Sequence, residues 1–536
     1  MESKAFVYPK GCVFSSLESI KDKHVTVMGL GLNGGGEASV RFFLQHGAYV
    51  IATDMKTAEQ LKPTIDRLAN DKTLDLSRLT YRLGEHRIED FSNADCVIKN
   101  PGVKIEGNKY LAAAKAIETD ISIFLNFTKA PIIAVTGSKG KSSTVSAIYY
   151  GLKEAGRTAF LGGNITVSPL TFLDQTNERT PVVLELSSWQ LADLRGRGVL
   201  KPKISLITKI VPDHQNWYGN MESYVADKKL IYADQDKNDF AIFTLDDDWG
   251  NQFASECKAN IYRYSSCKPS QNGGWFTKDE NGNPYSKGIL QTTIDSHPKI
   301  VLEEVSVPGN HMKENLLNAA LVLRLMEVPA KSIKEILSRF PGVPHRLQFF
   351  HSWQVSGSEC DSYSSQDEKI TYNFYNDSCA TVPEAAAAAS QAFGKPVIFI
   401  TGGTDKGLDF DLLADSILCK DKNTIPLKAL YLLAGNGTDK LLKLLDSAAA
   451  DSTGGKNSTI SEDATDGKGL KYCGPFNSLT ELLTQLKTDL QNNKYNIQDE
   501  TAVPVVFSPG ATSFGMFTNE FDRGNKFMNG TKEIFC

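Results

Sequence analysis

Short apolar runs recur along the chain, and a polar or glycine-rich turn and then a segment with helical periodicity follow most of them. Runs of this kind are typical of strands buried inside a parallel sheet. They occur at residues 24–28, 49–53, 131–135, 182–184, 204–208, 396–400, 429–433 and 504–507. The repeated order of strand, turn and helix predicts an α/β protein whose sheets are mostly parallel.

The length of 536 residues exceeds what one hydrophobic core supports, so we expect three domains. Residues 1–122 are predicted to form a Rossmann-like domain, and residues 123–342 a central P-loop domain with a mostly parallel sheet. Residues 343–536 are predicted to form a second Rossmann-like domain. A stretch rich in Pro and Gly, residues 341–346, resembles a linker before this last domain.

Three further segments interrupt this pattern. Residues 261–302 contain two turn signals between short β-type runs, which predicts a small β-hairpin appendage. Residues 357–368 and 447–469 are rich in polar residues. Because they hold too little apolar surface to pack, they are predicted to be surface loops.

Composition narrows the class of protein. Hydrophobic residues make up 41% of the chain, charged residues 23%, and the net charge is −5. This balance offers no electrostatic footprint for nucleic acid or an anionic membrane surface, so we expect neither partner. The nine cysteines show no metal-binding spacing, and no apolar run is long enough to cross a membrane. We therefore expect a soluble, cytoplasmic protein, and we take it to be a monomer.

The first strand runs directly into a glycine-rich turn, residues 29–34 (GLGLNG), and the second strand ends on Asp54. This pattern matches the dinucleotide-binding βαβ unit, in which the acid contacts a ribose hydroxyl. Taken alone, it indicates an NAD(P) site. Because matches of this kind are frequent, the turn is equally consistent with another nucleotide diphosphate, or with no ligand.

A second glycine loop, residues 137–142 (GSKGKS), lies between the strand 131–135 and a helical segment. Backbone N–H groups, a lysine and a helix start are the combination that binds nucleotide phosphates, and a hydroxyl after the lysine is placed to hold Mg²⁺. The strict Walker pattern fails, because its first glycine would fall on Val135. The residues expected to contact the phosphates are Gly137, Ser138, Lys139, Gly140, Lys141, Ser142 and Ser143.

Three more polar side chains of the central domain are candidates for the site or lie near it. Glu185 ends a buried strand, at the edge of the sheet where α/β proteins bind ligands and where a carboxylate can hold Mg²⁺. His214 follows the next strand, a position that favours a ligand or metal contact over a merely packed imidazole. Lys228 lies between Tyr224 and Tyr232 on one helix face, and from the residues alone it is an ordinary amphipathic lysine.

Six motifs occur together and resemble those of the Mur ligases over almost the whole chain. They are GSKGKS at 137–142, ELSSWQ at 185–190, DH at 213–214, PHR at 344–346, NDS at 376–378 and SPGATS at 508–513. The segment ELSSWQ resembles the members that add D-glutamate to UDP-N-acetylmuramoyl-L-alanine in peptidoglycan synthesis. The resemblance implies that ATP phosphorylates the substrate carboxylate and that D-glutamate attacks the resulting acyl phosphate.

The resemblance also implies roles for particular residues, taken over position by position. The catalytic residues would be Lys141, His214 and Lys228. Mg²⁺, as two ions, would be held by Ser142, Glu185, His214 and Lys228, the last as a carbamate. ATP would also contact Asn315, Arg346 and Asp377. The UDP substrate would contact Leu32, Asn33, Asp54, Asn164 and His214, and the glycine turn is thereby reassigned from NAD(P) to UDP. D-Glutamate would contact Lys406 and Ser513, with Phe521 near the substrate.

Besides the insertion at 447–469, which has no assigned counterpart in the family, this sequence departs from the family pattern at three points. Lys139 replaces an asparagine and adds a cation beside the phosphates, Cys379 replaces a lysine, and Phe521 stands one place later than in some members. Three alternatives to the D-glutamate ligase therefore stay open. They are a Mur-type or folylpolyglutamate-type ligase with another amino acid, an NAD(P)-dependent oxidoreductase, and a nucleotide-binding regulator without catalysis.

Overall fold

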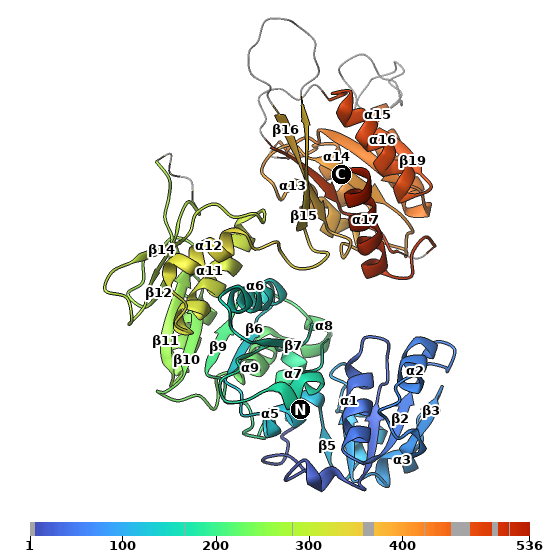
Figure 1. Ribbon diagram of the computed structural model, residues 1–536, viewed down its shortest axis with the longest axis vertical. Helices are drawn as coiled ribbons and strands as arrows, with labels where there is room; N and C mark the ends of the chain where they lie inside the picture. The colour runs from blue at the N-terminus through green and yellow to red at the C-terminus, as the bar shows by residue number, and fades with distance from the viewer. Residues whose placement is uncertain are drawn as a thin grey trace, which may run out of the picture. The chain divides into compact units, whose positions relative to one another are not determined.

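A computed structural model describes residues 6–165, 167–280, 282, 284–356, 369–422, 424–451, 472–495, 502–513 and 515–536. Over these residues the strands form three sheets, of five, nine and six strands, and helices pack against them (Figure 1). The predicted class, α/β with mostly parallel sheets, is confirmed. The predicted surface loop at 357–368 lies outside the described residues, as does the loop at 447–469 except for residues 447–451, which end a helix.

The first sheet has the strand order β3-β2-β1-β4-β5, and its neighbouring strands are parallel. The order reverses between β1 and β4, and ligands of open α/β sheets bind at such a reversal. Its strands are β1 (His24–Met28), β2 (Tyr49–Asp54), β3 (Leu79–Leu83), β4 (Cys96–Lys99) and β5 (Ile117–Glu118). Its helices are α1 (Gly35–Gln45), α2 (Lys62–Ala69), α3 (Ile88–Ser92) and α4 (Lys109–Ala112), and α5 (Asp120–Phe127) leads to the second sheet.

The second sheet has the order β14-β13-β12-β11-β10-β9-β6-β8-β7. Neighbouring strands in this order are parallel along the whole stretch between β12 and β7. Strand β13 is antiparallel to both of its neighbours, β12 and β14. Its strands are β6 (Ile132–Thr136), β7 (Phe160–Gly163), β8 (Val182–Glu185), β9 (Ile204–Ile207), β10 (Phe240–Thr244), β11 (Asn260–Ser265), β12 (Gly273–Phe276), β13 (Gly288–Gln291) and β14 (Lys299–Leu302). Its helices are α6 (Lys141–Glu154), α7 (Ser188–Ala192), α8 (Gln215–Tyr218), α9 (Met221–Lys229), α10 (Asp248–Glu256), α11 (Asn310–Leu325) and α12 (Ala330–Ser338).

The third sheet has the order β15-β16-β20-β17-β18-β19, parallel except for the edge strand β15, which is antiparallel to β16. Its strands are β15 (Gln348–Ser356), β16 (Lys369–Asn376), β17 (Ile398–Gly402), β18 (Ala429–Leu433), β19 (Tyr472–Phe476) and β20 (Ala502–Phe507). Its helices are α13 (Pro383–Gln391), α14 (Asp411–Ile417), α15 (Asn436–Asp451), α16 (Leu479–Gln491) and α17 (Glu520–Ile534).

The inner strands β17, β18 and β20 of this third sheet are buried on both faces, as their apolar runs require. Along β17, Ile398 and Ile400 pack with the side chains of α16 and α17. Phe399, which points to the opposite face, packs with those of α13, α14 and α15. This alternation follows from the period of two residues in a strand, and it explains why the run contains no polar position.

By the contacts between its residues the chain divides into two compact units. One holds residues 1–303 and 314–338, with the first two sheets, and the other holds residues 304–313 and 339–536, with the third. The three domain ranges predicted from the sequence stay a prediction, since this division neither separates the first two domains nor follows the limit at residue 342.

Residues 261–302 differ from the predicted hairpin appendage. Strand β12 pairs in parallel with β11, and β13 and β14 continue from it, so the segment extends the central sheet instead of forming a separate hairpin. Parallel pairing of β11 with β12 depends on main-chain contacts that no local turn signal reveals. In the described part of the chain, no helix combines the length and apolar character that a membrane crossing requires.

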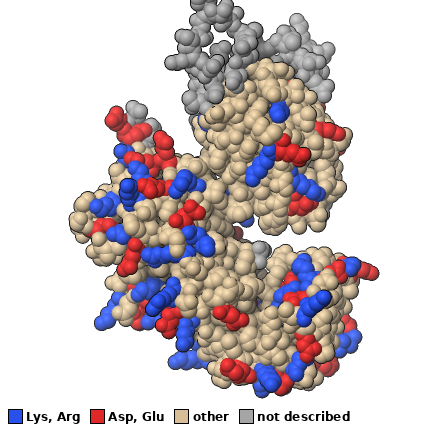
Figure 2. All heavy atoms as spheres, viewed as in Figure 1, with Lys and Arg blue, Asp and Glu red and all other residues tan. Residues whose placement is uncertain are grey.

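Acidic and basic side chains are interspersed on the face of the molecule shown in Figure 2, without a large area of one sign. This distribution agrees with a net charge close to zero for a chain of this size. It gives that face no general attraction for polyanions.

Candidate active site

The loop after β6 is the centre of the candidate site. Strand β6 lies between β8 and β9, so its carboxyl end is flanked by the ends of both neighbours. Gly137 has φ 143°, and a Cβ built there would lie 2.0 Å from the Oγ1 of Thr208. Gly140 has φ 90°, and its Cβ would lie 2.4 Å from the Oδ1 of Asn315. Both glycines are therefore required by conformation and by space.

The end of β9 and helix α9 hold this loop in place. The Ser138 hydroxyl donates to the carbonyl of Val211 at 2.9 Å and lies 3.0 Å from the Tyr224 hydroxyl. The Thr208 hydroxyl lies 2.6 Å from the Lys139 carbonyl, to which it donates. Ser138, which is only 4% exposed, thus holds the loop in place through its side chain. Thr208 was not predicted as a site residue, and its place at a strand end was the only sequence signal for it.

Two lysines converge on the carbonyl of Gly137. Lys141, at the start of α6, donates to the carbonyls of Gly137 and Ser138, each at 3.0 Å. Lys228, on α9, donates to the Gly137 carbonyl at 2.9 Å and lies 4.5 Å from the centre of the Tyr224 ring. Lys228 is 1% exposed. Burial, reinforced by the charge of Lys141, lowers the pKa of Lys228 to about 7.

Glu185 ends β8 beside this loop and is 1% exposed. Its Oε1 accepts a hydrogen bond from the Asn164 side chain at 2.9 Å. Its Oε2 is buried and has no hydrogen-bond partner among the described residues. An oxygen of this kind fits a hard cation, because Mg²⁺ prefers carboxylate and hydroxyl oxygens. Glu185 and Asn164 are thus joined by a hydrogen bond, and their roles at a metal and at the substrate stay predictions.

His214 is the N-cap residue of the short helix α8, and its φ is 51°. Its ring packs against Trp189, with 4.9 Å between ring centres, and its side chain is 44% exposed. The neighbouring Asp213 carboxylate lies 3.7 Å from the amine of Lys139, whose side chain is 71% exposed. The added cation of this loop is thus partly balanced by Asp213, which the sequence motif did not reveal.

The predicted metal residues form no separate cluster of His, Cys, Asp and Glu. Over the described residues, no group of three or more such side chains could hold a metal ion. The predicted set of Ser142, Glu185, His214 and Lys228 contains only two residues of those types. The role of this set as metal ligands therefore stays a prediction.

The glycine turn after β1 has the backbone that its sequence predicts. Gly29, Gly31 and Gly34 all have positive φ, between 61° and 95°. Each carboxylate oxygen of Asp54 accepts a backbone N–H at 2.9 Å, one from Gly31 and one from Lys56. Asp54 thus fixes the turn, and each oxygen keeps a lone pair for a ligand. The adjacent Leu32 and Asn33 are exposed.

The predicted ATP contacts Asp377 and Arg346 and the predicted D-glutamate contacts Lys406 and Ser513, all in the second unit, differ in exposure. Asp377 is buried, and its carboxylate accepts from the Ser508 hydroxyl at 2.6 Å and from the Leu347 N–H at 3.1 Å. Burial raises the pKa of Asp377 to about 6. Arg346 and Lys406 are exposed, whereas Ser513 is buried.

One aromatic side chain, Phe521, and one cationic side chain, Arg523, complete this region. Phe521 is 46% exposed, and its ring meets that of His345 edge to face at 5.6 Å. Arg523 is buried and donates to the Ser378 hydroxyl, to the Ser378 carbonyl and to the Ala511 carbonyl. It ties the two loops that carry the predicted contacts, and was not predicted as a site residue.

Two family models match this chain. The model of the Mur ligase middle domain matches residues 135–323, and that of the Mur ligase MurD-like N-terminal domain matches residues 23–123. The first covers the P-loop, Glu185, His214 and Lys228. The second covers the glycine turn and Asp54.

Curated relatives match nearly the whole chain. The UDP-N-acetylmuramoylalanine–D-glutamate ligase of Treponema pallidum is 36% identical, over 96% of this chain and 98% of that protein. The protein of the same name from Borreliella burgdorferi is 34% identical, with the same coverage.

Solved structures share the fold at low identity. MurF from Acinetobacter baumannii gives a TM-score of 0.52 at 14% identity, over 97% of this chain and 93% of that one. The UDP-N-acetylmuramate-alanine ligase MurC from Thermotoga maritima gives a TM-score of 0.50 at 16% identity, over 95% and 99%.

Proposed function

The chain belongs to the Mur ligase family, and on that premise we propose that it joins D-glutamate to UDP-N-acetylmuramoyl-L-alanine at the expense of ATP. The observation that carries this choice of substrate is the similarity, over almost the full length, to relatives that bear the name of this ligase. The segment ELSSWQ at 185–190, which is similar to that of the D-glutamate-adding members, favours the same choice.

The proposed reaction activates one carboxylate. A carboxylate oxygen of the L-alanyl residue attacks the γ-phosphorus of ATP, and ADP leaves. The amine of D-glutamate then attacks the acyl carbon, loses a proton, and phosphate leaves as the amide forms. Bringing two anions together requires nearby positive charge, and Lys141, which donates to the Gly137 carbonyl of the glycine loop, would supply it.

Mg²⁺ fits the residues beside the loop. We propose that Glu185, through its unpaired Oε2, and the Ser142 hydroxyl hold Mg²⁺, together with His214 and a carbamate on Lys228, and that two ions bind. The metal would neutralise phosphoryl charge. Because the pKa of Lys228 is about 7, a substantial fraction of the protein molecules carry this lysine as the neutral amine at neutral pH. That amine can bond to the carbon of CO₂ and release a proton, which converts a cation into an anion.

The remaining roles follow from the family and are proposals too. Asn315 lies against Gly140, beside the phosphate loop, as an ATP contact requires. In the second unit, Arg346 and Asp377 would contact ATP, Lys406 and Ser513 the D-glutamate carboxylates, and Phe521 the substrate. Leu32, Asn33 and Asp54 would contact the UDP moiety. We also propose that the enzyme works as a monomer in the cytoplasm, where ATP is available.

Amino-acid-dependent release of ADP tests this proposal. Purified protein with ATP, Mg²⁺ and UDP-N-acetylmuramoyl-L-alanine should release ADP when D-glutamate is added, and much more slowly with L-glutamate, L-alanine or L-lysine. Equal rates with an L-amino acid would assign the chain to another ligase. Binding of a nicotinamide cofactor without ATP turnover would favour the oxidoreductase alternative instead.

A further inference from the structure

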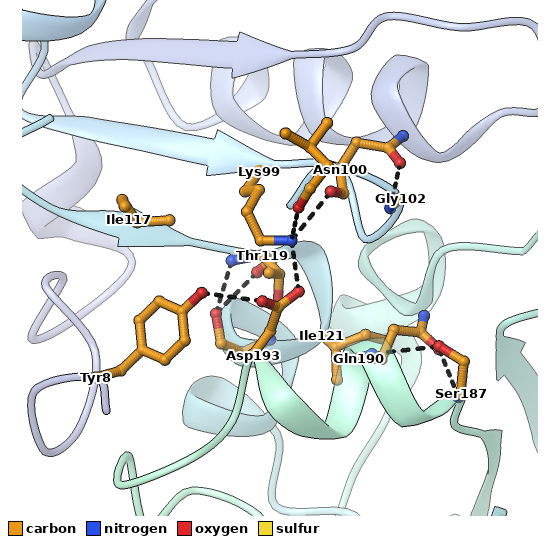
Figure 3. Close-up of polar contacts among 12 residues, drawn as sticks. Tyr8, Lys99, Asn100, Gly102, Ile117, Thr119, Ile121, Ser187, Gln190 and Asp193 are labelled. Carbon is orange, nitrogen blue, oxygen red and sulfur yellow. Dashed lines mark hydrogen bonds and ion pairs between the residues drawn. The ribbon is translucent and has the colours of Figure 1, made fainter. Parts of the chain in front are cut away.

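A buried ion pair connects the first sheet to the second. The amine of Lys99, the last residue of β4, lies 2.8 Å from the Oδ2 of Asp193, which directly follows α7. Both side chains are less than a tenth exposed, at 3% and 7%. Figure 3 shows Lys99 and Tyr8 meeting the carboxylate of Asp193 from different sides. The Tyr8 hydroxyl donates to its Oδ1 at 2.9 Å.

Lys99 also fixes the turn that follows β4. Besides the ion pair, its amine donates to the carbonyls of Asn100 and Val103, at 3.2 and 2.9 Å. The amine thus makes two hydrogen bonds and one ion pair, and the two carbonyls bracket the turn 100–103. Asn100 packs against the glycine turn: a Cβ built on Gly29 would lie 3.2 Å from the Cβ of Asn100. Lys99, Asn100 and Gly29 line one small cavity at the reversal of strand order.

Asp193 is connected to the proposed metal site through a short, rigid segment. Helix α7 begins directly after Ser187, whose hydroxyl accepts from the Gln190 N–H at 3.2 Å. In return, the Ser187 N–H donates to the Gln190 Oε1 at 3.0 Å. This capping box locks the first turn of the helix. Glu185 lies two residues before Ser187 in the chain. The position of Asp193 is therefore coupled to that of Glu185.

We infer that Lys99 and Asp193 are positioning residues, which hold the turn 100–103 of the UDP-substrate pocket at a fixed distance from Glu185. The inference rests on the proposed function, in which the UDP end of the substrate binds one sheet and its carboxylate reacts beside the other. A substrate held at both ends is sensitive to this distance, since a small displacement of the reacting carboxylate lowers the rate strongly.

A second ion pair between the same two sheets provides a matched control. Arg197 and Glu118 are 2.8 Å apart, with side chains 2% and 3% exposed. Arg197 also donates to the Ile117 carbonyl, at 2.6 Å, and Glu118 accepts from the Val13 N–H, at 3.0 Å. In the described part of the chain, neither residue forms a hydrogen bond or an ion pair with the turn 100–103. Arg197 also donates to the Asp193 carbonyl, at 2.8 Å. Replacing Glu118 keeps Arg197 and this bond, so it should loosen the same interface without moving the substrate turn.

Kinetics of Lys99→Met and Glu118→Gln test the inference. We expect Lys99→Met to raise the KM for UDP-N-acetylmuramoyl-L-alanine about tenfold and to lower kcat, with the KM for ATP unchanged. Both variants should lower the thermal unfolding midpoint, and by similar amounts, because each breaks a buried ion pair. Glu118→Gln should nevertheless keep the KM for the UDP substrate within about twofold of the parent. Equal effects of the two variants on that KM would overturn the inference and leave a structural role only.

Two further measurements keep the test decisive. If Lys99→Met does not fold, Lys99→Arg keeps the charge, but a planar guanidinium cannot reproduce the two hydrogen bonds and the ion pair in their three directions. It should raise the KM for the UDP substrate by a few fold, and a KM equal to that of the parent would overturn the inference. The parent enzyme is assayed beside the variants, so absence of D-glutamate-dependent ADP release in the parent would reject the proposed function itself.

Discussion

The amines of Lys141 and Lys228 donate to the same acceptor, the carbonyl oxygen of Gly137, at 3.0 and 2.9 Å. Two cations at one acceptor repel each other, and Lys228 is the more deeply buried partner. Its pKa therefore falls to about 7, with burial as the larger cause. Removing the charge of Lys228 would relieve this repulsion, and a carbamate would replace it with attraction to Lys141.

We predict that Lys228→Ala abolishes the ligase reaction, with a loss of at least about a hundredfold in kcat, because a bridging group at the phosphoryl site is removed. Bicarbonate or short carboxylates should restore part of the activity by occupying the space of the carbamate. D-Glutamate-dependent ADP release measures both effects.

Lys229→Ala is the matched control for this experiment. Lys229 is the neighbouring residue, but its amine pairs with the carboxylate of Glu256, at 2.8 Å, away from the loop. Its replacement should leave kcat within about twofold of the parent. Full activity of Lys228→Ala would reject a role for that side chain in the reaction.

The low pKa of Lys228 also predicts how stability changes with pH. Between about pH 7 and the ordinary value of 10.5, the unfolded chain holds a proton at this lysine that the folded protein has lost. The contribution to stability therefore increases as pH rises through this window and decreases as pH falls. Lys228→Met lacks this dependence.

Thermal unfolding in CO₂-free buffer measures the difference. Relative to Lys228→Met, the parent should gain on the order of 2–3 kcal/mol of stability between about pH 7 and about pH 9.5. A constant difference between the two proteins over that range would show that the lysine titrates at its ordinary pKa. Using the difference removes the titration of all other groups.

The fold was largely predictable because buried parallel strands leave a strong signal. The runs at 131–135, 182–184 and 204–208 correspond to β6, β8 and β9, and their order brings the loop at 137–142 beside Glu185. The extension of the central sheet by β12, β13 and β14 was not predicted. Its parallel junction is a long-range pairing, which local turn signals do not encode.

The support of the site was less predictable than its motifs. Thr208 holds the glycine loop through its hydroxyl, and Asp213 partly balances Lys139, yet neither relationship follows from spacing in the sequence. Lys99 and Asp193 lie far apart in the chain, and buried ion pairs carry no sequence pattern. Only the folded arrangement shows which charged residues meet.

Glu185→Gln should weaken Mg²⁺ binding, because an amide is a poorer ligand than the unpaired carboxylate oxygen. We expect the Mg²⁺ concentration for half-maximal activity to rise about tenfold or more. Glu178→Gln, a change at an exposed acid, should leave it unchanged. An unaltered Mg²⁺ requirement in Glu185→Gln would remove this residue from the proposed metal site.

Gly137→Ala should damage the loop by sterics alone. A methyl group there would lie 2.0 Å from the Thr208 hydroxyl, at a φ of 143° that other residues rarely adopt. We expect a loss of roughly 2–4 kcal/mol in stability, together with loss of ATP binding, since the loop must shift to relieve the clash.

Gly156→Ala serves as the control for Gly137→Ala. Gly156 also has a positive φ, 76°, but no atom lies within 4 Å of the Cβ that the substitution would add. That variant should lose only about 1 kcal/mol and keep its affinity for ATP. Equal losses in the two variants would mean that backbone strain, and not contact with Thr208, makes Gly137 necessary.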